Sequence, residues 1–351
     1  FYGLNVINKK IMELDYKKTT QNILKSLPDR TRAVLSRRFA LGKSNNPETL
    51  DAIGKSYNIT RERVRQIESD GIKRAKKVAD TPEIKEEFKK IKAFFEKKLD
   101  SCGGVQKEEE LLAEIKSKEE KNCVLFLLSL VDSIYKEKED DKFNSFFVNN
   151  KNLIAESKKI SSDLINFLKE AKTPETFEGL YEEFKKRGVK LSKEAFRCYS
   201  EISKDISKTI DSKKIGLKSW PEVNPKTVKD KIKLILKEKE KPLHFKDIAE
   251  MIFGMSQTLS GEKKKRLHPQ TVHNELIRNQ DFVLVGRGYY ALKDWGYNPG
   301  QVKDVIYDIL KSSNSPLKKE EVIKAVLDQR MVKESTVLLN LQNKKLFQRD
   351  E

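Results

Sequence analysis

The chain has 351 residues, of which 36% are charged and 37% hydrophobic, and its formal net charge is +18. This length usually means several domains, and the apolar content excludes wholesale disorder. The three cysteines stand far apart without metal-ligand spacing, and the longest apolar run, residues 123–131, is only about half a membrane span. We therefore expect a cytoplasmic protein with reduced thiols that meets a polyanion, either nucleic acid or an anionic membrane surface.

The positive charge is concentrated near the start of the chain. Residues 1–80 hold 18 Lys and Arg against 9 Asp and Glu, which is half of the excess. Residues 16–42 predict two helices, and residues 48–57 predict a third with one apolar face. A short turn then leads to a basic helix that Thr60 is suited to cap. Two helices joined in this way predict a helix-turn-helix.

The second helix of this motif carries side chains suited to reading bases. Val64 and Ile67 occupy its inner side. The candidates on the other side and its margins are Arg61, Glu62, Arg65 and Gln66. In the major groove, arginine pairs with guanine, glutamine with adenine, and glutamate accepts from cytosine. The alternative is a solvated basic helix with charge pairs along its length.

Other cations near this motif are suited to contacts with phosphates, which position a protein on DNA without specifying sequence. The candidates outside the basic helix are Arg30, Arg37, Arg38 and Lys55. On the helix itself, Arg63 and Lys73 are either phosphate contacts or plain solvated charge.

The middle of the chain alternates helical patterns with breaks at Gly, Pro and Asn. Residues 81–150 and residues 151–222 each read as three helices followed by extended residues. That order predicts a winged helix, a small helical domain with a β-hairpin wing, in each segment. The expected fold class is therefore mainly α, with a helix-turn-helix domain at residues 16–80 followed by tandem winged helices.

The last part of the chain contains an internal repeat. The triplet VKD at 228–230 recurs at 302–304, and PL at 242–243 recurs at 316–317, both offset by 74 residues. We expect two related domains at residues 223–298 and 299–351, the second ending part-way through its hairpin. In the first, a Gly-Arg-Gly turn places Arg287 at the wing tip, either as a phosphate or minor-groove contact or as a solvated turn residue.

Residues 16–77 resemble the fourth conserved region of primary-type bacterial sigma factors. The resemblance rests on LPDRTRAVLSRRFAL at 27–41 and on TLDAIGKSYNITRERVRQIESDGIKRAKK at 49–77. It implies reading of the −35 promoter element and contact with the flap of the RNA polymerase β subunit. The positions it assigns to bases are Arg61, Glu62, Arg65 and Gln66; to the DNA backbone, Arg30, Arg38 and Thr49; and to the polymerase flap, Phe39 and Leu41.

Residues 225–296, and less fully 300–351, resemble the HARE-type winged helix. The resemblance rests on NPKTVKDKIKLILKEKEKPLHFKDIAEMI and HPQTVHNELIRNQDFVLVGRGYYALKDWG. This family includes the delta subunit of RNA polymerase from firmicutes. Together the two resemblances imply a bacterial transcription protein.

No catalytic signature appears in the sequence. The histidine pair His268 and His273 misses the spacing of a helical metal site, and there is no phosphate-cradling glycine loop. We expect no enzyme activity, cofactor, metal ion, membrane or small-molecule substrate. The expected partners are double-stranded DNA and the RNA polymerase core, at the nucleoid. The alternatives are a polymerase accessory subunit that binds the β flap and a DNA-targeting component of a restriction or defence system.

Overall fold

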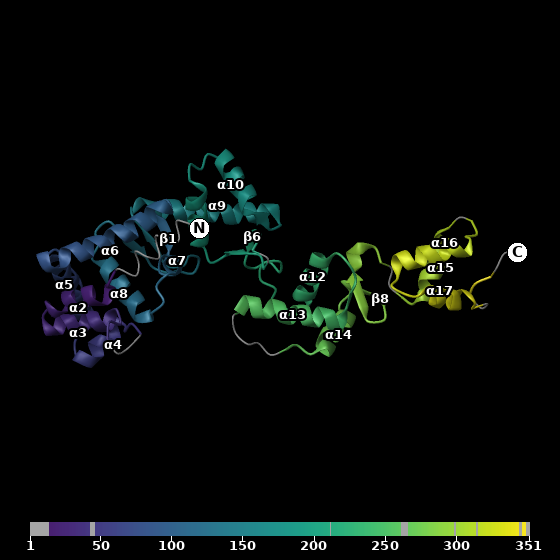
Figure 1. The fold of residues 1–351 in the computed structure, drawn as a ribbon, viewed down its shortest axis with the longest axis horizontal. Helices are drawn as coiled ribbons and strands as arrows, with labels where there is room; N and C mark the ends of the chain where they lie inside the picture. Colours follow the sequence, from purple (N-terminus) through teal and green to yellow (C-terminus); the bar gives the residue numbers. More distant parts are fainter. Residues whose placement is uncertain are drawn as a thin grey trace. The chain divides into compact units, whose positions relative to one another are not determined.

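The computed structural model is mainly helical and describes residues 14–42, 46–210, 212–260, 266–297, 300–313, 315–343 and 346–348 (Figure 1). The chain forms two compact units, Phe1–Ser207 and Lys208–Glu351. No helix among the described residues is long and apolar enough to cross a membrane. The predicted mainly α fold class is confirmed.

The first unit begins with the predicted helices, α2 (Tyr16–Lys25), α3 (Asp29–Arg38), α4 (Leu50–Tyr57) and α5 (Arg61–Ala79). Three of them start at residues whose side chains accept a hydrogen bond from the first turn: Asp15, Thr49 and Thr60. Such caps satisfy backbone N–H groups that have no partner within the helix. α3 has no side-chain cap, and its N-cap is Pro28.

Residues 82–148 follow as α6 (Pro82–Ser101), β1 (Val105–Lys107), α7 (Glu108–Leu111), α8 (Lys118–Ser129), β2 (Tyr135–Glu137) and β3 (Phe146–Val148). The strands form an antiparallel sheet in the order β1-β3-β2, with Val105 opposite Val148. The same element order returns in α9 (Asn152–Ala171), β4 (Glu175–Thr176), α10 (Phe177–Lys186), α11 (Lys193–Glu201), β5 (Ile206–Lys208) and β6 (Lys214–Leu217).

One hydrophobic core joins the helix-turn-helix helices to the segment that follows. It includes Ile23 of α2 and Leu35 of α3, both fully buried, together with Phe95 of α6 and Phe126 of α8. α8 packs along α2, and α6 packs along both α2 and α5 (Figure 1). The cluster therefore runs across residue 80, where the sequence predicts the end of the first domain.

The second unit contains the internal repeat. The first copy comprises α12 (Val228–Lys239), β7 (Leu243–His244), α13 (Phe245–Ser260), α14 (Pro269–Arg278), β8 (Phe282–Gly286), β9 (Tyr289–Leu292) and a short 3-10 helix (Lys293–Trp295). Its sheet has the order β7-β9-β8, which corresponds strand for strand to β1-β3-β2. The second copy comprises α15 (Val302–Ser312), α16 (Lys319–Gln329) and α17 (Glu334–Leu341).

The repeat is visible in atomic detail at the start of each copy. Asp230 accepts a hydrogen bond from the Thr227 backbone N–H at 3.1 Å where α12 begins, and Asp304 accepts one from the Gln301 backbone N–H at 2.6 Å where α15 begins. Asp230 and Asp304 are the last residues of the two VKD triplets, so the repeated triplet marks the same first helical turn. Of the hairpin expected at the end of the second copy, residues 344–345 and 349–351 lie outside the described residues.

Candidate nucleic-acid interface

A tight turn sets the angle between α4 and α5. Asn58 ends α4 in the left-handed conformation, with φ of 52°, and Thr60 caps α5 by accepting a hydrogen bond from Arg63 N at 3.2 Å. Gly54 lies beneath this turn, where an added Cβ would come within 2.8 Å of the Ile59 carbonyl oxygen. A side chain there would collide with the backbone, so the close approach of α4 and the turn requires glycine.

The inner side of the motif is a small separate core. Val34, Ile53 and Val64 are fully buried and come from α3, α4 and α5 respectively. Ile67 packs against them from the next turn of α5. Because these contacts fix which side of α5 faces inward, the opposite side of its first two turns is presented to the exterior.

The four predicted base-reading residues all lie on the exposed part of α5. Arg61, Glu62, Arg65 and Gln66 are exposed. Arg65 donates two hydrogen bonds to the Glu62 carboxylate, from Nε at 2.8 Å and from Nη2 at 2.7 Å. Arg63 donates from Nη1 to Gln66 Oε1 at 3.1 Å. The structure thus places the predicted set on one exposed part of the helix, where Glu62 bonds Arg65 and Gln66 bonds the neighbouring Arg63.

The Glu62–Arg65 pair sets the charge of this surface. The hydrogen bond from Arg65 lowers the pKa of the Glu62 carboxyl, and the same contact raises the pKa of Arg65, so both groups carry full charge at neutral pH. More than half of each side chain remains accessible. Exposed pairs of this kind are weak, so a base edge is able to replace either partner.

The predicted phosphate contacts divide into two groups. Arg30, Lys55, Arg63 and Lys73 are exposed, as a phosphate contact requires. Thr49 is also exposed, but its hydroxyl caps α4 by accepting from Ala52 N at 3.2 Å.

Arg38 is partly buried and already engaged. It donates from Nε to Glu68 Oε1 at 3.1 Å and from Nη1 to the Glu48 carbonyl oxygen at 2.5 Å. Arg37 donates to both carboxylate oxygens of Glu48, at 2.8 and 2.6 Å. These two arginines therefore tie α3 to the segment before α4 and to α5. Glu48 and Glu68 were not singled out in the sequence, because partners 11 and 30 residues away leave no local spacing signal.

The two predicted polymerase contacts face the shared core. Phe39 meets Phe126 of α8 edge to face, with ring centroids 5.4 Å apart. Leu41 also packs against this core, and between them Asn122 of α8 donates to the Ala40 carbonyl oxygen at 3.2 Å. The segment from Phe39 to Leu41 is therefore partly covered by α8 of the same chain.

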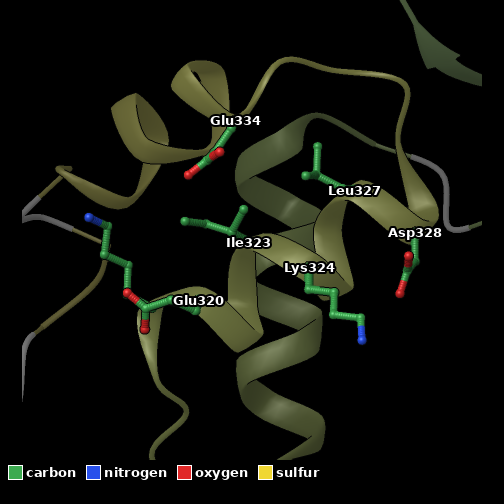
Figure 2. A pocket seen from close by; sticks show the side chains of 7 residues that line it. Glu320, Ile323, Lys324, Leu327, Asp328 and Glu334 are labelled. Atoms are coloured by element: carbon green, nitrogen blue, oxygen red, sulfur yellow. The ribbon is translucent and has the colours of Figure 1, made fainter.

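Two features of the second unit bear on binding: the turn between β8 and β9, and a hollow beside α16. Arg287 is exposed at the turn between β8 and β9, as predicted. An open hollow of about 420 Å³ lies beside α16, and Figure 2 shows Ile323 and Leu327 among acidic and basic side chains there. Among the described residues, no three His, Cys, Asp or Glu side chains lie close enough together to hold a metal ion.

The helix-turn-helix segment of this chain is similar in sequence to known proteins. Residues 23–77 match the family described as Sigma-70, region 4. Sixty-four residues are 47% identical to RNA polymerase sigma factor RpoD from Helicobacter pylori strain 26695, covering 18% of this chain and 10% of that protein. The RpoD of strain J99 is also 47% identical over 64 residues, covering 9% of its length. The chain thus spans about a tenth of the curated relatives it matches.

The matched segment includes the residues that form the exposed face of α5. The predicted resemblance to sigma region 4 is confirmed over residues 23–77. The resemblance of residues 225–296 to the HARE-type winged helix stays a prediction.

Proposed function

We propose that this protein binds duplex DNA sequence-specifically through α5 and recognises promoter DNA of the −35 type in transcription. One observation carries the proposal: Arg61, Glu62, Arg65 and Gln66 share the exposed face of a helix that Val64 anchors on the other side. This face belongs to the segment that matches sigma region 4. An α-helix fits the major groove, where these side-chain types distinguish the base pairs.

The chemistry of the surface fits binding rather than catalysis. The exposed cations of α5 and its neighbours supply contacts to phosphates, and the polar set on its first two turns supplies contacts to bases. Phosphate contacts release counterions, so affinity falls steeply as salt concentration rises. We propose no enzymatic step for this protein.

The test is selection of bound duplexes from a random DNA pool by the full chain, repeated with Arg65→Ala. We expect enrichment of one short motif, and we expect Arg65→Ala to weaken binding to the selected duplex about 5- to 150-fold and to relax preference at one base pair. Lys73→Ala is the matched control, since Lys73 is exposed on the same helix several turns from the motif turn. An equal loss on all sequences for both variants contradicts base reading.

Contact with the RNA polymerase core is the finer part of the proposal. Phe39 and Leu41 are partly buried against α8, so a polymerase surface that enclosed both side chains would displace α8. Amide hydrogen exchange of the full chain, measured with and without polymerase core, tests whether the polymerase contacts Phe39 and Leu41 or another surface. Loss of protection in α8 supports a contact at Phe39 and Leu41. Co-purification with unchanged protection in α8 places the contact elsewhere, and failure to co-purify contradicts polymerase binding.

A further inference from the structure

The end of α6 and the helix α11 meet at unusually close range. Gly103 follows α6 in the left-handed conformation, with φ of 66°, and an added Cβ there would lie 2.5 Å from Ala195 Cβ and 3.5 Å from Ala195 Cα. One turn further along α11, Tyr199 donates its hydroxyl to the Gly103 carbonyl oxygen at 3.0 Å. The backbone after α6 is therefore held directly against one face of α11.

A cysteine from each element faces this junction. Cys102 immediately precedes Gly103, and Cys198 lies on α11 between Ala195 and Tyr199. Each is 6% exposed, and the two thiols lie close enough for each to shift the pKa of the other. Contact with the Cys198 thiol lowers the pKa of Cys102, whereas contact with Cys102 and burial raise the pKa of Cys198, so Cys102 is the sulfur that ionises. No part of the proposed DNA-binding function uses either residue.

We propose that Cys102 and Cys198 are an oxidisable thiol pair, which a peroxide converts to an intramolecular disulfide that joins α6 to α11. The Cys102 thiolate attacks one peroxide oxygen, the O–O bond breaks, and Cys102 becomes a sulfenic acid with release of water after proton uptake. The Cys198 sulfur then attacks the sulfenic sulfur, a second water leaves, and one S–S bond forms. Two thiols and one hydrogen peroxide thus give one disulfide and two waters.

The third cysteine is an internal control. Cys123 on α8 is 5% exposed, as buried as the pair, but no contact with a second thiol lowers its pKa. Burial raises the pKa of Cys123, which disfavours its thiolate. Peroxide should therefore spare Cys123 at doses that oxidise Cys102 and Cys198.

The disulfide would close a long loop. It would link the end of α6 to α11. α6 belongs to the segment that shares a core with the helix-turn-helix, and α11 is the third helix of the segment after it. Closing a loop of that length restricts the unfolded chain strongly and so stabilises the folded one.

The experiment treats the full reduced chain with graded hydrogen peroxide, alkylates the remaining thiols and maps cysteines by mass spectrometry. We expect loss of about 2 Da, the two thiol hydrogens, with Cys102 and Cys198 peptides joined and Cys123 alkylated. The melting temperature of the first unit should rise by about 4 °C or more, and reductant should reverse the rise.

Two variants make the assignment specific. Cys198→Ser should form no intramolecular disulfide and should show a sulfenic acid at Cys102 that dimedone traps, whereas Cys123→Ser should behave as the unmodified chain does. Absence of the 102–198 link in the unmodified, folded chain overturns the proposal. So does oxidation of Cys123 at the same dose, or a disulfide that includes Cys123.

Discussion

The two units join their neighbouring domains in different ways. In the first unit, the helix-turn-helix helices and the segment that follows them, residues 82–148, bury residues in one cluster, from Tyr16 to Phe147. In the second unit, each copy of the repeat keeps its own cluster, around Ile235 in one and around Ile306 in the other. The copies meet where Met331 N donates to the Val285 carbonyl oxygen at 2.8 Å, beside the buried side chain of Arg330, which donates to the Leu284 carbonyl oxygen.

This difference has a consequence for function. Part of the helix-turn-helix surface is used inside the first unit, because α8 packs against Phe39 and Leu41. The exposed face of α5 is left open by the same arrangement. In the second unit each copy of the repeat has its own core, so the two copies should fold more independently of one another.

The largest expected effect comes from truncating the shared core. Phe126→Ala removes a fully buried ring that packs on Phe39 and should lower the free energy of unfolding by about 3–5 kcal/mol. Amide hydrogen exchange should accelerate in α2 and α3 as well as in α8. The control is Leu125→Ala, at a partly buried neighbour on the same helix, with a smaller loss. Unchanged exchange in α2 and α3 contradicts a shared core.

The effect of a matched side-chain truncation in the second unit should be confined to one copy of the repeat. Ile306→Ala removes a fully buried side chain of α15 and should cost about 2–5 kcal/mol in the second copy of the repeat. Hydrogen exchange should accelerate in α15, α16 and α17, while α12 and β8 keep their protection. If α12 loses protection equally, the two copies fold as one unit and the contrast between the units disappears.

The junction between the copies should show a smaller effect. Arg330 is 4% exposed, and its Nη2 donates to the Gly300 carbonyl oxygen at 2.6 Å, while Nη1 donates to that of Leu284. Arg330→Leu should leave these carbonyls without that donor and cost about 1–3 kcal/mol, measured by denaturant unfolding. Arg278→Leu, at an exposed arginine, is the control and should have little effect. Equal losses of unfolding free energy in the two variants would show that Arg330 does not specifically link the copies.

The smallest effect on stability is expected at the proposed interface. Glu62→Gln removes the carboxylate that holds Arg65, but the pair is exposed, so thermal unfolding at neutral pH should hardly change. Arg65 lowers the pKa of Glu62, so the slight stability from this pair is lost as pH falls through that lowered pKa. Base preference, measured by selection from a DNA pool, should shift while melting does not. A large drop in melting temperature would make Glu62 a structural residue.

The sequence predicts local features of the fold well because their causes lie within a few residues. The cap at Thr60, the apolar spacing of Val64 and Ile67, and the start of a helix at each VKD triplet all act within one or two helical turns. The exposed set on α5 follows from the same periodicity. The sequence could not predict the contacts of Phe39 with Phe126 and of Arg38 with Glu68, because those contacts depend on packing between distant segments.

The measurement that tests the central claim most directly compares Arg65→Ala and Lys73→Ala on a selected duplex and on an unrelated one, over a range of salt concentrations. We predict that Arg65→Ala erases most of the difference in affinity between the two duplexes. Lys73→Ala should instead weaken both alike and reduce the salt dependence. A chain that binds both duplexes equally before any substitution, or an Arg65→Ala variant that keeps its discrimination, would contradict base reading by α5.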